Sequence, residues 1–368
     1  MSKKCPKHPK YRGIRPPKSN CKTCWKFYQE IKAITDDKIA LDRLAIQSSE
    51  KLRELSKKYK NILTENDDLK QIIQAMQTIK ASTKRFTISQ KKGGASEATA
   101  IIVASDWHFE ENVRPETINN LNAFNIEIGK IRANNFWRNS LTLINLCKKD
   151  ITINNILLVL LGDFITNMIH EELAETNLLA PIDACIEVQN ILISGIEFLL
   201  RNTDCRLTIP CHSGNHGRTT ARPRHSNEGG HSLEHFIYHN MAIHFANNPR
   251  VSFLIAQGYH TYINIYNMTI RIHHGHDIRY QGGVGGLYIP LNKAIAQWNK
   301  GCRADLDILG HFHQFRDGGN FIVNGSLIGY NAYALSIKAE FEKPRQAFFL
   351  IDKKRGKTIV APILLDSN

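Results

Sequence analysis

The sequence predicts an α/β domain in its C-terminal part, preceded by a long helix and a small cysteine-containing module. Three observations lead to this order. From residue 99 onward, short apolar β-branched runs alternate with segments of helical patterning. Five of those runs are followed by Asp, Asn or His. Residues 29–80 contain no Gly or Pro, which is typical of a long helix. We therefore expect four segments. Their bounds are 1–28, 29–80, 81–98 and 99–368.

Segment 1–28 contains two pairs of metal-ligand residues in the pattern C-x2-H-x12-C-x2-C, formed by Cys5, His8, Cys21 and Cys24. Four ligands of this kind suit tetrahedral Zn²⁺. The segment is too small to bury a core, so bound metal would supply its folding energy. Nine Lys or Arg and several aromatic residues, with no Asp or Glu, suit phosphate contact and base stacking. A chance cluster of cysteines and a zinc module that binds protein remain alternatives.

Segment 29–80 carries apolar residues at alternating steps of three and four, the period of a coiled coil. Asn66 falls at an a position, where a buried amide pairs with its mate and fixes the register of a parallel dimer. We therefore expect a homodimer through residues 29–80. Two amphipathic helices folded on each other or on the catalytic domain are the alternative. Segment 81–98 is polar, basic and contains glycine, which predicts a linker.

The composition favours an acidic partner and a reducing compartment. The formal charge is +14 and the pI is about 9.4, which indicates nucleic acid ahead of a membrane surface. No apolar run approaches the roughly 20 residues of a membrane span, and the N-terminus shows no secretory pattern. The cysteines outside the first module are scattered and odd in number, which predicts a cytoplasmic location with reduced thiols.

Each of the five strand-like runs from residue 100 onward ends at residues able to bind a metal. The run 100–104 leads to Asp106 and His108, 156–161 to Gly162 and Asp163, 206–210 to Gly214, Asn215 and His216, 268–272 to His273, His274, Gly275, His276 and Asp277, and 306–309 to Gly310, His311 and His313. Ligands gather at the carboxyl ends of strands in α/β sheets, so these ends can converge on one cleft. Glycine beside a ligand lets the backbone turn sharply there.

In this order, the motifs DxH, GD, GNH, HG and GHxH resemble the signature of the calcineurin-like metallophosphoesterases, over about residues 99–368. The resemblance implies a layered β-sandwich flanked by helices, with two divalent metals. It assigns one metal to Asp106, His108, Asp163 and His313, and the second to Asp163, Asn215, His274 and His311. Asp163 would bridge the two metals. His274 matches because it precedes Gly275, with His273 and His276 as alternatives. Mn²⁺ is the expected metal, and Mg²⁺, Fe²⁺ and Zn²⁺ are the alternatives.

These residue types suit hydrolysis of a phosphate ester. Two metals roughly 3.5–4 Å apart clamp a phosphate and activate a bridging hydroxide for in-line attack. The resemblance places His216 beside the phosphate, where an imidazolium can protonate the leaving oxygen. Arg218 follows two residues later, where its guanidinium can bind a phosphate oxygen in bidentate fashion.

The residues within the motifs narrow the choice of substrate class. Gly162-Asp163-Phe164 and Asn215-His216-Gly217 differ from the GDxVDRG and GNHE motifs of the phosphoprotein phosphatases. Ser105-Asp106-Trp107-His108 looks more like the SbcD-type DNA exonuclease branch, and the wider pattern resembles phosphoesterases that phages encode. The expected function is therefore a two-metal phosphodiesterase acting as a DNA nuclease, in the host cytoplasm if the chain is phage-encoded. The alternatives are a phosphomonoesterase or nucleotide phosphatase, and a DNA-binding or scaffolding protein with an auxiliary phosphoesterase domain.

Overall fold

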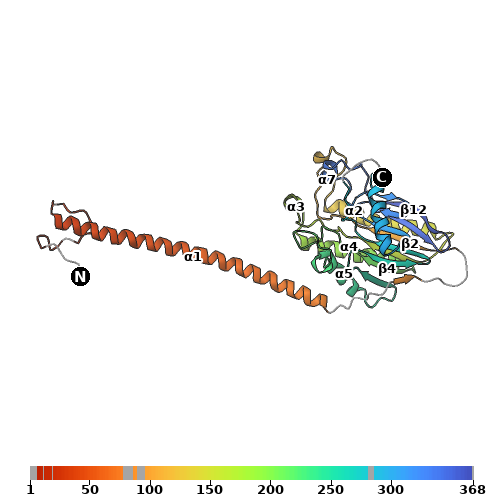
Figure 1. Cartoon of the computed structure of the whole chain (residues 1–368), viewed down its shortest axis with the longest axis horizontal. Helices are drawn as coiled ribbons and strands as arrows, with labels where there is room; N and C mark the ends of the chain where they lie inside the picture. Colours follow the sequence, from red (N-terminus) through yellow and green to blue (C-terminus); the bar gives the residue numbers. More distant parts are fainter. Residues whose placement is uncertain are drawn as a thin grey trace. The chain divides into compact units, whose positions relative to one another are not determined.

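The computed structural model describes residues 6–10, 12–18, 20–77, 86–88, 96–280 and 286–366. Within these ranges, side chains are described except at positions 39–40, 45, 62–77 and 86–88. Contacts divide the chain into two units, Met1–Ile79 and Lys80–Asn368. Figure 1 labels several elements of each unit. The two units are described separately.

The first unit contains one long helix, α1 (Lys22–Gln77). It begins inside the segment assigned to the zinc module, so Cys24 lies on its first turn. It also runs without a break through Thr35. The Thr35 hydroxyl donates a hydrogen bond of 2.8 Å to the Ile31 carbonyl oxygen, one turn earlier in the same helix. The structure therefore has a single helix here, and not two folded on each other.

Ile31 is half-buried, and several later apolar heptad positions of α1 are exposed in the single chain. They include Ile34, Leu41, Leu52, Leu55 and Tyr59. The side chain of Asn66 lies outside the described residues, as does that of every heptad position beyond Tyr59. The pairing of two chains through this stripe stays a prediction.

The second unit contains two six-stranded sheets (Figure 1). The first sheet has the order β12-β11-β2-β3-β4-β5. Its strands are β2 (Glu97–Ala104), β3 (Thr152–Leu160), β4 (Arg206–Cys211), β5 (Val251–Ile255), β11 (Arg345–Asp352) and β12 (Gly356–Leu364). The second sheet has the order β1-β6-β7-β8-β10-β9. Its strands are β1 (Phe86–Ile88), β6 (Thr261–Ile265), β7 (Met268–Ile272), β8 (Leu306–Leu309), β9 (Arg316–Asp317) and β10 (Phe321–Val323).

Strand β1 differs from expectation, because it lies within the segment expected to be a linker, 81–98. It pairs in parallel with β6 at the edge of the second sheet, with Phe86 opposite Ile263. Part of that segment is therefore built into the sandwich. The rest of residues 81–95 lies outside the described residues.

Strand β2 shows why the two sheets stack. Its alternate residues Ile101 and Val103 join a core shared with Ile270 and Ile308 of the second sheet. Ala100, Ile102 and Ala104, on the other face of the strand, join the core under the helices. A strand buried on both faces must be apolar at every position, which is why 100–104 reads as a continuous apolar run.

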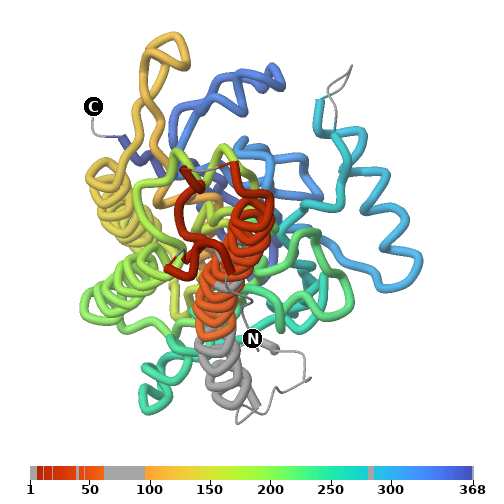
Figure 2. Tube along the Cα trace, turned by 90° about the vertical axis from the view of Figure 1, so that its left-hand side faces the viewer, coloured from red at the N-terminus to blue at the C-terminus, as the bar shows by residue number. Residues whose placement is uncertain are grey.

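Helices cover the outer faces of both sheets. On the first sheet lie α2 (Ile126–Cys147), α4 (Pro181–Asn202) and α5 (Leu233–His244). On the second, α6 (Tyr288–Gly301) packs Leu291 and Ile295 against Phe321. Figure 2 shows α2 and α4 side by side, with α6 on the opposite side of the unit. The short elements are η1 (Pro115–Ile118), α3 (Glu171–Thr176), η2 (Gly229–His231) and α7 (Ala332–Ser336). The layered β-sandwich flanked by helices is therefore confirmed.

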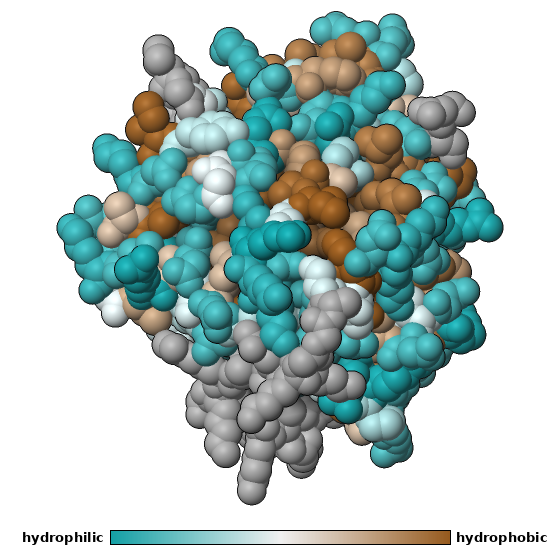
Figure 3. Space-filling view, turned by 90° about the vertical axis from the view of Figure 1, so that its right-hand side faces the viewer, coloured by the Kyte–Doolittle hydropathy of each residue, from teal (hydrophilic) through white to brown (hydrophobic). Residues whose placement is uncertain are grey.

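The surface of the second unit is mixed in character. Hydrophilic side chains cover much of the face drawn in Figure 3, with apolar groups between them. Among the described helices, none combines the length and the apolar character that crossing a membrane requires.

Candidate metal centre

The five motif loops follow the carboxyl ends of strands from both sheets. Strands β2, β3 and β4 are parallel neighbours in the first sheet, and β7 and β8 are parallel neighbours in the second. Parallel strands end at the same edge of their sheet. The predicted ligands are therefore delivered by three strand ends of one sheet and two of the other, at one edge of the sandwich.

The first ligand group consists of Asp106, His108 and His313, whose potential ligand atoms all lie within 4.8 Å of one another. The Nε2 atoms of His108 and His313 are 3.2 Å apart, and His313 Nε2 is 3.5 Å from Asp106 Oδ1. The side chains of Asp106 and His108 are buried. Nitrogen and oxygen lone pairs that converge in a buried space at these distances suit a divalent metal.

The second ligand group consists of Asp163, His274 and His311. The Nδ1–H of His274 donates to the Leu161 carbonyl oxygen at 2.6 Å. Its Nε2 then turns a lone pair toward Asp163 Oδ2 at 2.9 Å. Two lone pairs at that distance require a cation between them. Although burial acts in the opposite direction, Asp163 raises the pKa of His274 to about 10, so that a proton can serve as this cation.

Asp163 and Asn215 complete the set. Asp163 also forms a group with His108 and His216, so it is the residue common to both halves of the centre. Burial alone would raise its pKa, but His274 and His216 hold the pKa of Asp163 well below the ordinary value. The Asn215 Oδ1 is buried and has no hydrogen-bond partner in the described part of the chain. The seven residues assigned to the metals fit two divalent ions, and their individual roles stay predictions.

Most of these ligands share an unusual backbone conformation. Their φ angles lie in the left-handed region that favours glycine. They are Asp106 (56°), His108 (46°), Asp163 (51°), His311 (70°) and His313 (54°). Such residues cost of order 1–3 kcal/mol each and concentrate at functional sites, where the surrounding structure holds them. Here the tight turn at each strand end aims neighbouring side chains at one point.

Two glycines allow the motif loops to touch. Gly162 has a φ of 81°, and a Cβ on it would collide with the backbone nitrogen of Gly214. A Cβ on Gly214 would in turn collide with the Asp163 carboxylate. Since only glycine fits at both positions, the β3 and β4 loops run in direct contact and hold Asp163 beside Asn215.

Two buried glutamates, which the sequence did not single out, hold the ligand loops in place. Glu234, on the first turn of α5, accepts the backbone N–H groups of Phe164 and Gly214, each at 2.7 Å. Glu110 accepts those of Thr166 and Asn167 at 2.8 and 2.7 Å. Burial and then the Asp163 carboxylate raise the pKa of Glu234 to about 8. Neither glutamate belongs to a metal motif, and only the fold brings Glu234 to the loops.

Glu234→Gln is expected to weaken metal binding without removing a ligand. The new amide NH₂ would face one of the two backbone N–H donors, and an unsatisfied buried donor costs about 1–3 kcal/mol. Loss of such outer contacts lowers metal affinity by roughly 10–100-fold. Calorimetric titration with Mn²⁺ measures this, with Glu187→Gln on the surface as the matched control. Equal affinity in the two variants would contradict the positioning role.

His216 and Arg218 differ in their surroundings. The Nδ1–H of His216 donates to the Thr166 carbonyl oxygen at 2.9 Å, and its ring centroid lies 4.7 Å from that of His108. Burial lowers the pKa of His216. The guanidinium of Arg218 instead donates to the backbone carbonyl oxygens of Asn215 and Thr220, at 2.5 and 3.2 Å. It joins none of the ligand groups, and its expected role in binding phosphate stays a prediction.

The first unit holds a separate group of potential ligands. His8, Cys21 and Cys24 lie within 4.8 Å of one another, and Cys24 Sγ is 3.3 Å from His8 Nδ1. Cys5, the fourth predicted zinc ligand, lies outside the described residues.

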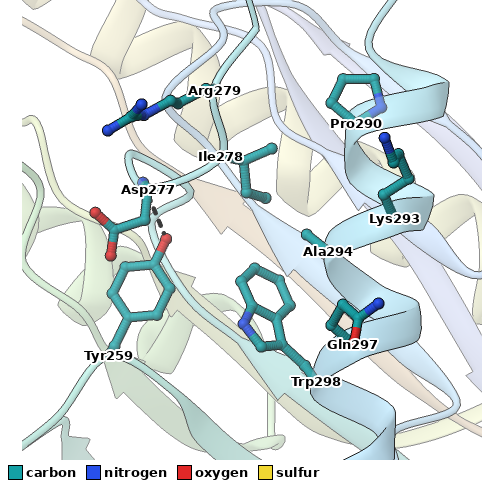
Figure 4. Close-up of a pocket in the computed structure, with 9 residues that line it drawn as sticks. All are labelled: Tyr259, Asp277, Ile278, Arg279, Pro290, Lys293, Ala294, Gln297 and Trp298. Carbon is teal, nitrogen blue, oxygen red and sulfur yellow. Dashed lines mark hydrogen bonds between the residues drawn. The ribbon is translucent and has the colours of Figure 1, made fainter.

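A cleft of about 500 Å³ lies near the predicted ligand His274. Figure 4 shows its lining, from Tyr259, Asp277, Ile278, Arg279, Pro290, Lys293, Ala294, Gln297 and Trp298. The Asp277 backbone N–H donates to the Tyr259 hydroxyl at 3.2 Å. Two successive ring contacts link the cleft to the metal centre: Tyr259 to His276, with centroids 5.3 Å apart, and His276 to His274, at 5.7 Å.

No protein-family model matches the chain, and no curated protein matches its sequence. Solved structures with a likeness to it include three of similar coverage. A hypothetical protein from Pyrococcus horikoshii is 11% identical, with a TM-score of 0.36, over 73% of this chain and 89% of that one. A Vps29 mutant from Entamoeba histolytica is 14% identical, with a TM-score of 0.28, over 72% and 97%. A Streptococcus pneumoniae protein described as a predicted phosphoesterase is 13% identical, with a TM-score of 0.31, over 74% and 92%. At these values the likenesses say nothing about the chemistry, which rests on the chain's own residues.

Proposed function

We propose that this chain is a two-metal-dependent phosphodiesterase that acts on nucleic acid as a DNA nuclease. The observation that carries the proposal is the position of Asp163, which belongs to the second ligand group and also lies in a group with His108 of the first. Metal ions held there supply Lewis acidity and a nucleophile derived from water. The expected metal is Mn²⁺.

The residues of the chain have separate tasks in this proposal. Asp163 holds both halves of the centre at a fixed spacing. His216 keeps Nδ1 on the Thr166 carbonyl oxygen, which orients its Nε2 for transfer of a proton to the leaving oxygen. Burial keeps solvent from Asp106 and His108, which strengthens electrostatic interactions with the phosphate.

Two observations support nucleic acid as the substrate. The formal charge of +14 attracts a polyanion. The cleft in Figure 4 is lined by the aromatic rings of Tyr259 and Trp298 and also by the cationic side chains of Arg279 and Lys293. Aromatic rings next to basic groups stack on bases while the cations contact phosphates.

The test is cleavage by the purified full-length protein with Mn²⁺. Labelled single-stranded DNA, double-stranded DNA, RNA, a chromogenic phosphodiester and a chromogenic phosphomonoester are compared. The proposal expects cleavage of DNA and of the phosphodiester. Cleavage of the monoester alone would favour a nucleotide phosphatase instead. DNA binding without any cleavage would favour the DNA-binding or scaffolding alternative.

For the first unit we propose one structural Zn²⁺ on Cys5, His8, Cys21 and Cys24. The double variant Cys21→Ser/Cys24→Ser is expected to lose about one Zn²⁺ per chain, because it removes both thiolates of one ligand pair. Metal analysis of the full-length protein measures this, with Cys302→Ser as the control. Unchanged zinc content in the double variant would remove the proposal. Thiolate ligands require reduced cysteines, so this proposal also assumes the reducing cytoplasm.

We further propose that two chains pair through α1 and so present two basic modules to DNA. Leu52→Glu/Leu55→Glu is expected to give a monomer, because two charges would be buried in the apolar seam. Ile46 is a matched control: its side chain is 60% exposed, against 59% for Leu55, but it lies off the heptad stripe. Light scattering compares Ile46→Glu with the double variant. The monomer should bind long DNA far less than half as well, because two tethered sites gain from effective concentration. A monomeric unmodified chain would end the proposal.

A further inference from the structure

A third group of potential metal ligands lies beside the proposed two-metal centre and shares none of its assigned residues. It consists of His225, His276 and Asp277, whose ligand atoms all lie within 4.8 Å of one another. His276 and Asp277 belong to the loop after β7. His225 comes from the basic loop that joins β4 to α5, about fifty residues earlier in the chain. The group is therefore assembled by the fold.

The distances within this group suit a small divalent cation. His225 Nδ1 is 3.3 Å from Asp277 Oδ2, and His276 Nε2 is 3.9 Å from Asp277 Oδ1. Zn²⁺ binds imidazole nitrogen and carboxylate oxygen at roughly 2.0–2.2 Å in tetrahedral geometry, which puts neighbouring ligand atoms about 3.4 Å apart. The two separations run to the two different oxygens of the Asp277 carboxylate, and they lie on either side of that value. Small side-chain rotations would bring them to it.

The side chain of His276 gives an independent indication that a ligand belongs here. It is only 4% exposed. Both of its ring nitrogens are buried and have no hydrogen-bond partner in the described part of the chain. Its neighbours are aromatic rings, at centroid distances of 5.3 Å to Tyr259, 5.7 Å to His274 and 6.4 Å to His311. Burying polar atoms without partners is costly, and a metal bond to Nε2 would satisfy one of them.

We propose that His225, His276 and Asp277 form a third divalent-cation site of the zinc type, separate from the two-metal centre. Two imidazoles and one carboxylate leave the fourth tetrahedral position for water or a ligand oxygen. The sequence offered His276 as an alternative to His274, and the structure separates the two. His274 Nε2 faces Asp163, whereas His276 Nε2 lies toward Asp277. Asp277 also lines the cleft. A cation bound here would therefore connect the loop of His225 to the edge of that cleft.

The first test counts zinc ions bound by the full-length protein after dialysis against buffered Zn²⁺. His225→Ala and Asp277→Asn are each expected to bind about one Zn²⁺ per chain fewer than the unmodified protein. Both residues are exposed, so neither change should disturb folding. The matched control is His244→Ala. His244 is another surface histidine, 3.5 Å from the Glu197 carboxylate, and it joins no group of three potential ligands among the described residues. Equal zinc content in the unmodified protein and in His225→Ala would overturn the proposal.

The second test uses the peptide bond between Arg224 and His225, which trypsin can cut because Arg224 is exposed. Zn²⁺ is expected to slow this cut several-fold in the unmodified protein and not to slow it in His225→Ala. Asp163→Asn, which removes the residue common to the two-metal centre, should keep the protection. Protection that persists in His225→Ala would overturn the third site. Protection that is lost in Asp163→Asn would do the same, by assigning the effect to the two-metal centre. Neither result depends on hydrolytic activity, so the third site and the proposed function can fail separately.

Discussion

Asp163→Asn is expected to abolish hydrolysis and to lower the occupancy of both catalytic metals. Asp163 belongs to the second ligand group and also lies in a group with His108 of the first, so the loss of its charge is expected to affect both ions. A catalytic metal contributes several kcal/mol of transition-state stabilisation. Because about 1.36 kcal/mol corresponds to a tenfold change in rate, the loss should be on the order of 10³-fold or more.

The measurement combines metal analysis with initial rates on a chromogenic phosphodiester in Mn²⁺. Asp204→Asn makes the same chemical change on the exposed loop before β4 and serves as the control. Asp163→Asn also preserves the volume of the side chain, so the buried loops around it keep their packing. If this variant kept wild-type rates and metal content, the assignment of the centre would be wrong.

His216→Ala is expected to have the second-largest effect, and it separates chemistry from metal binding. His216 is not an assigned ligand, and its ring is held by the Thr166 carbonyl oxygen. We expect nearly full metal content together with a fall in turnover of roughly 10²–10⁴-fold, the range for a lost general acid.

A substrate with a good leaving group provides the internal control for this variant. Such a group leaves without protonation, so His216→Ala should be far less impaired on it than on DNA. Equal impairment on both substrates would show that His216 does not act on the leaving oxygen. Loss of metal would show that it acts as a ligand.

The ligand types of the centre could be predicted from sequence because each metal motif is local. Asp106 and His108 are separated by a single residue and follow an apolar strand, and this spacing can be seen in the sequence itself. Convergence was also predictable, because strand ends at a common edge bring such loops together. The layered sandwich expected from the motif resemblance is present in the structure.

The supporting contacts could not be predicted, because they join residues that are distant in sequence. Glu234 lies 70 residues from Phe164, and its two hydrogen bonds exist only once α5 packs beside both loops. On the same helix, His235 and His239 are buried, and their Nε2 atoms lie 2.9 Å apart. Strand β1 was missed for a related reason. A three-residue edge strand of Phe86–Ile88 gains its hydrogen bonds from β6, more than 170 residues away.

The assigned ligands come from loops of both sheets, so bound metals would connect the two layers. Asp106, Asp163 and Asn215 belong to loops of one sheet, whereas His274 and His311 belong to loops of the other. Elsewhere the layers meet through a shared apolar core that includes Val103 and Ile272, and apolar contacts resist sliding weakly because they have no preferred direction. Metal–ligand bonds are directional and short. Removal of bound metals should therefore loosen the sandwich first at the edge that carries the proposed centre, so the same ligands would also set the stiffness of the frame around them.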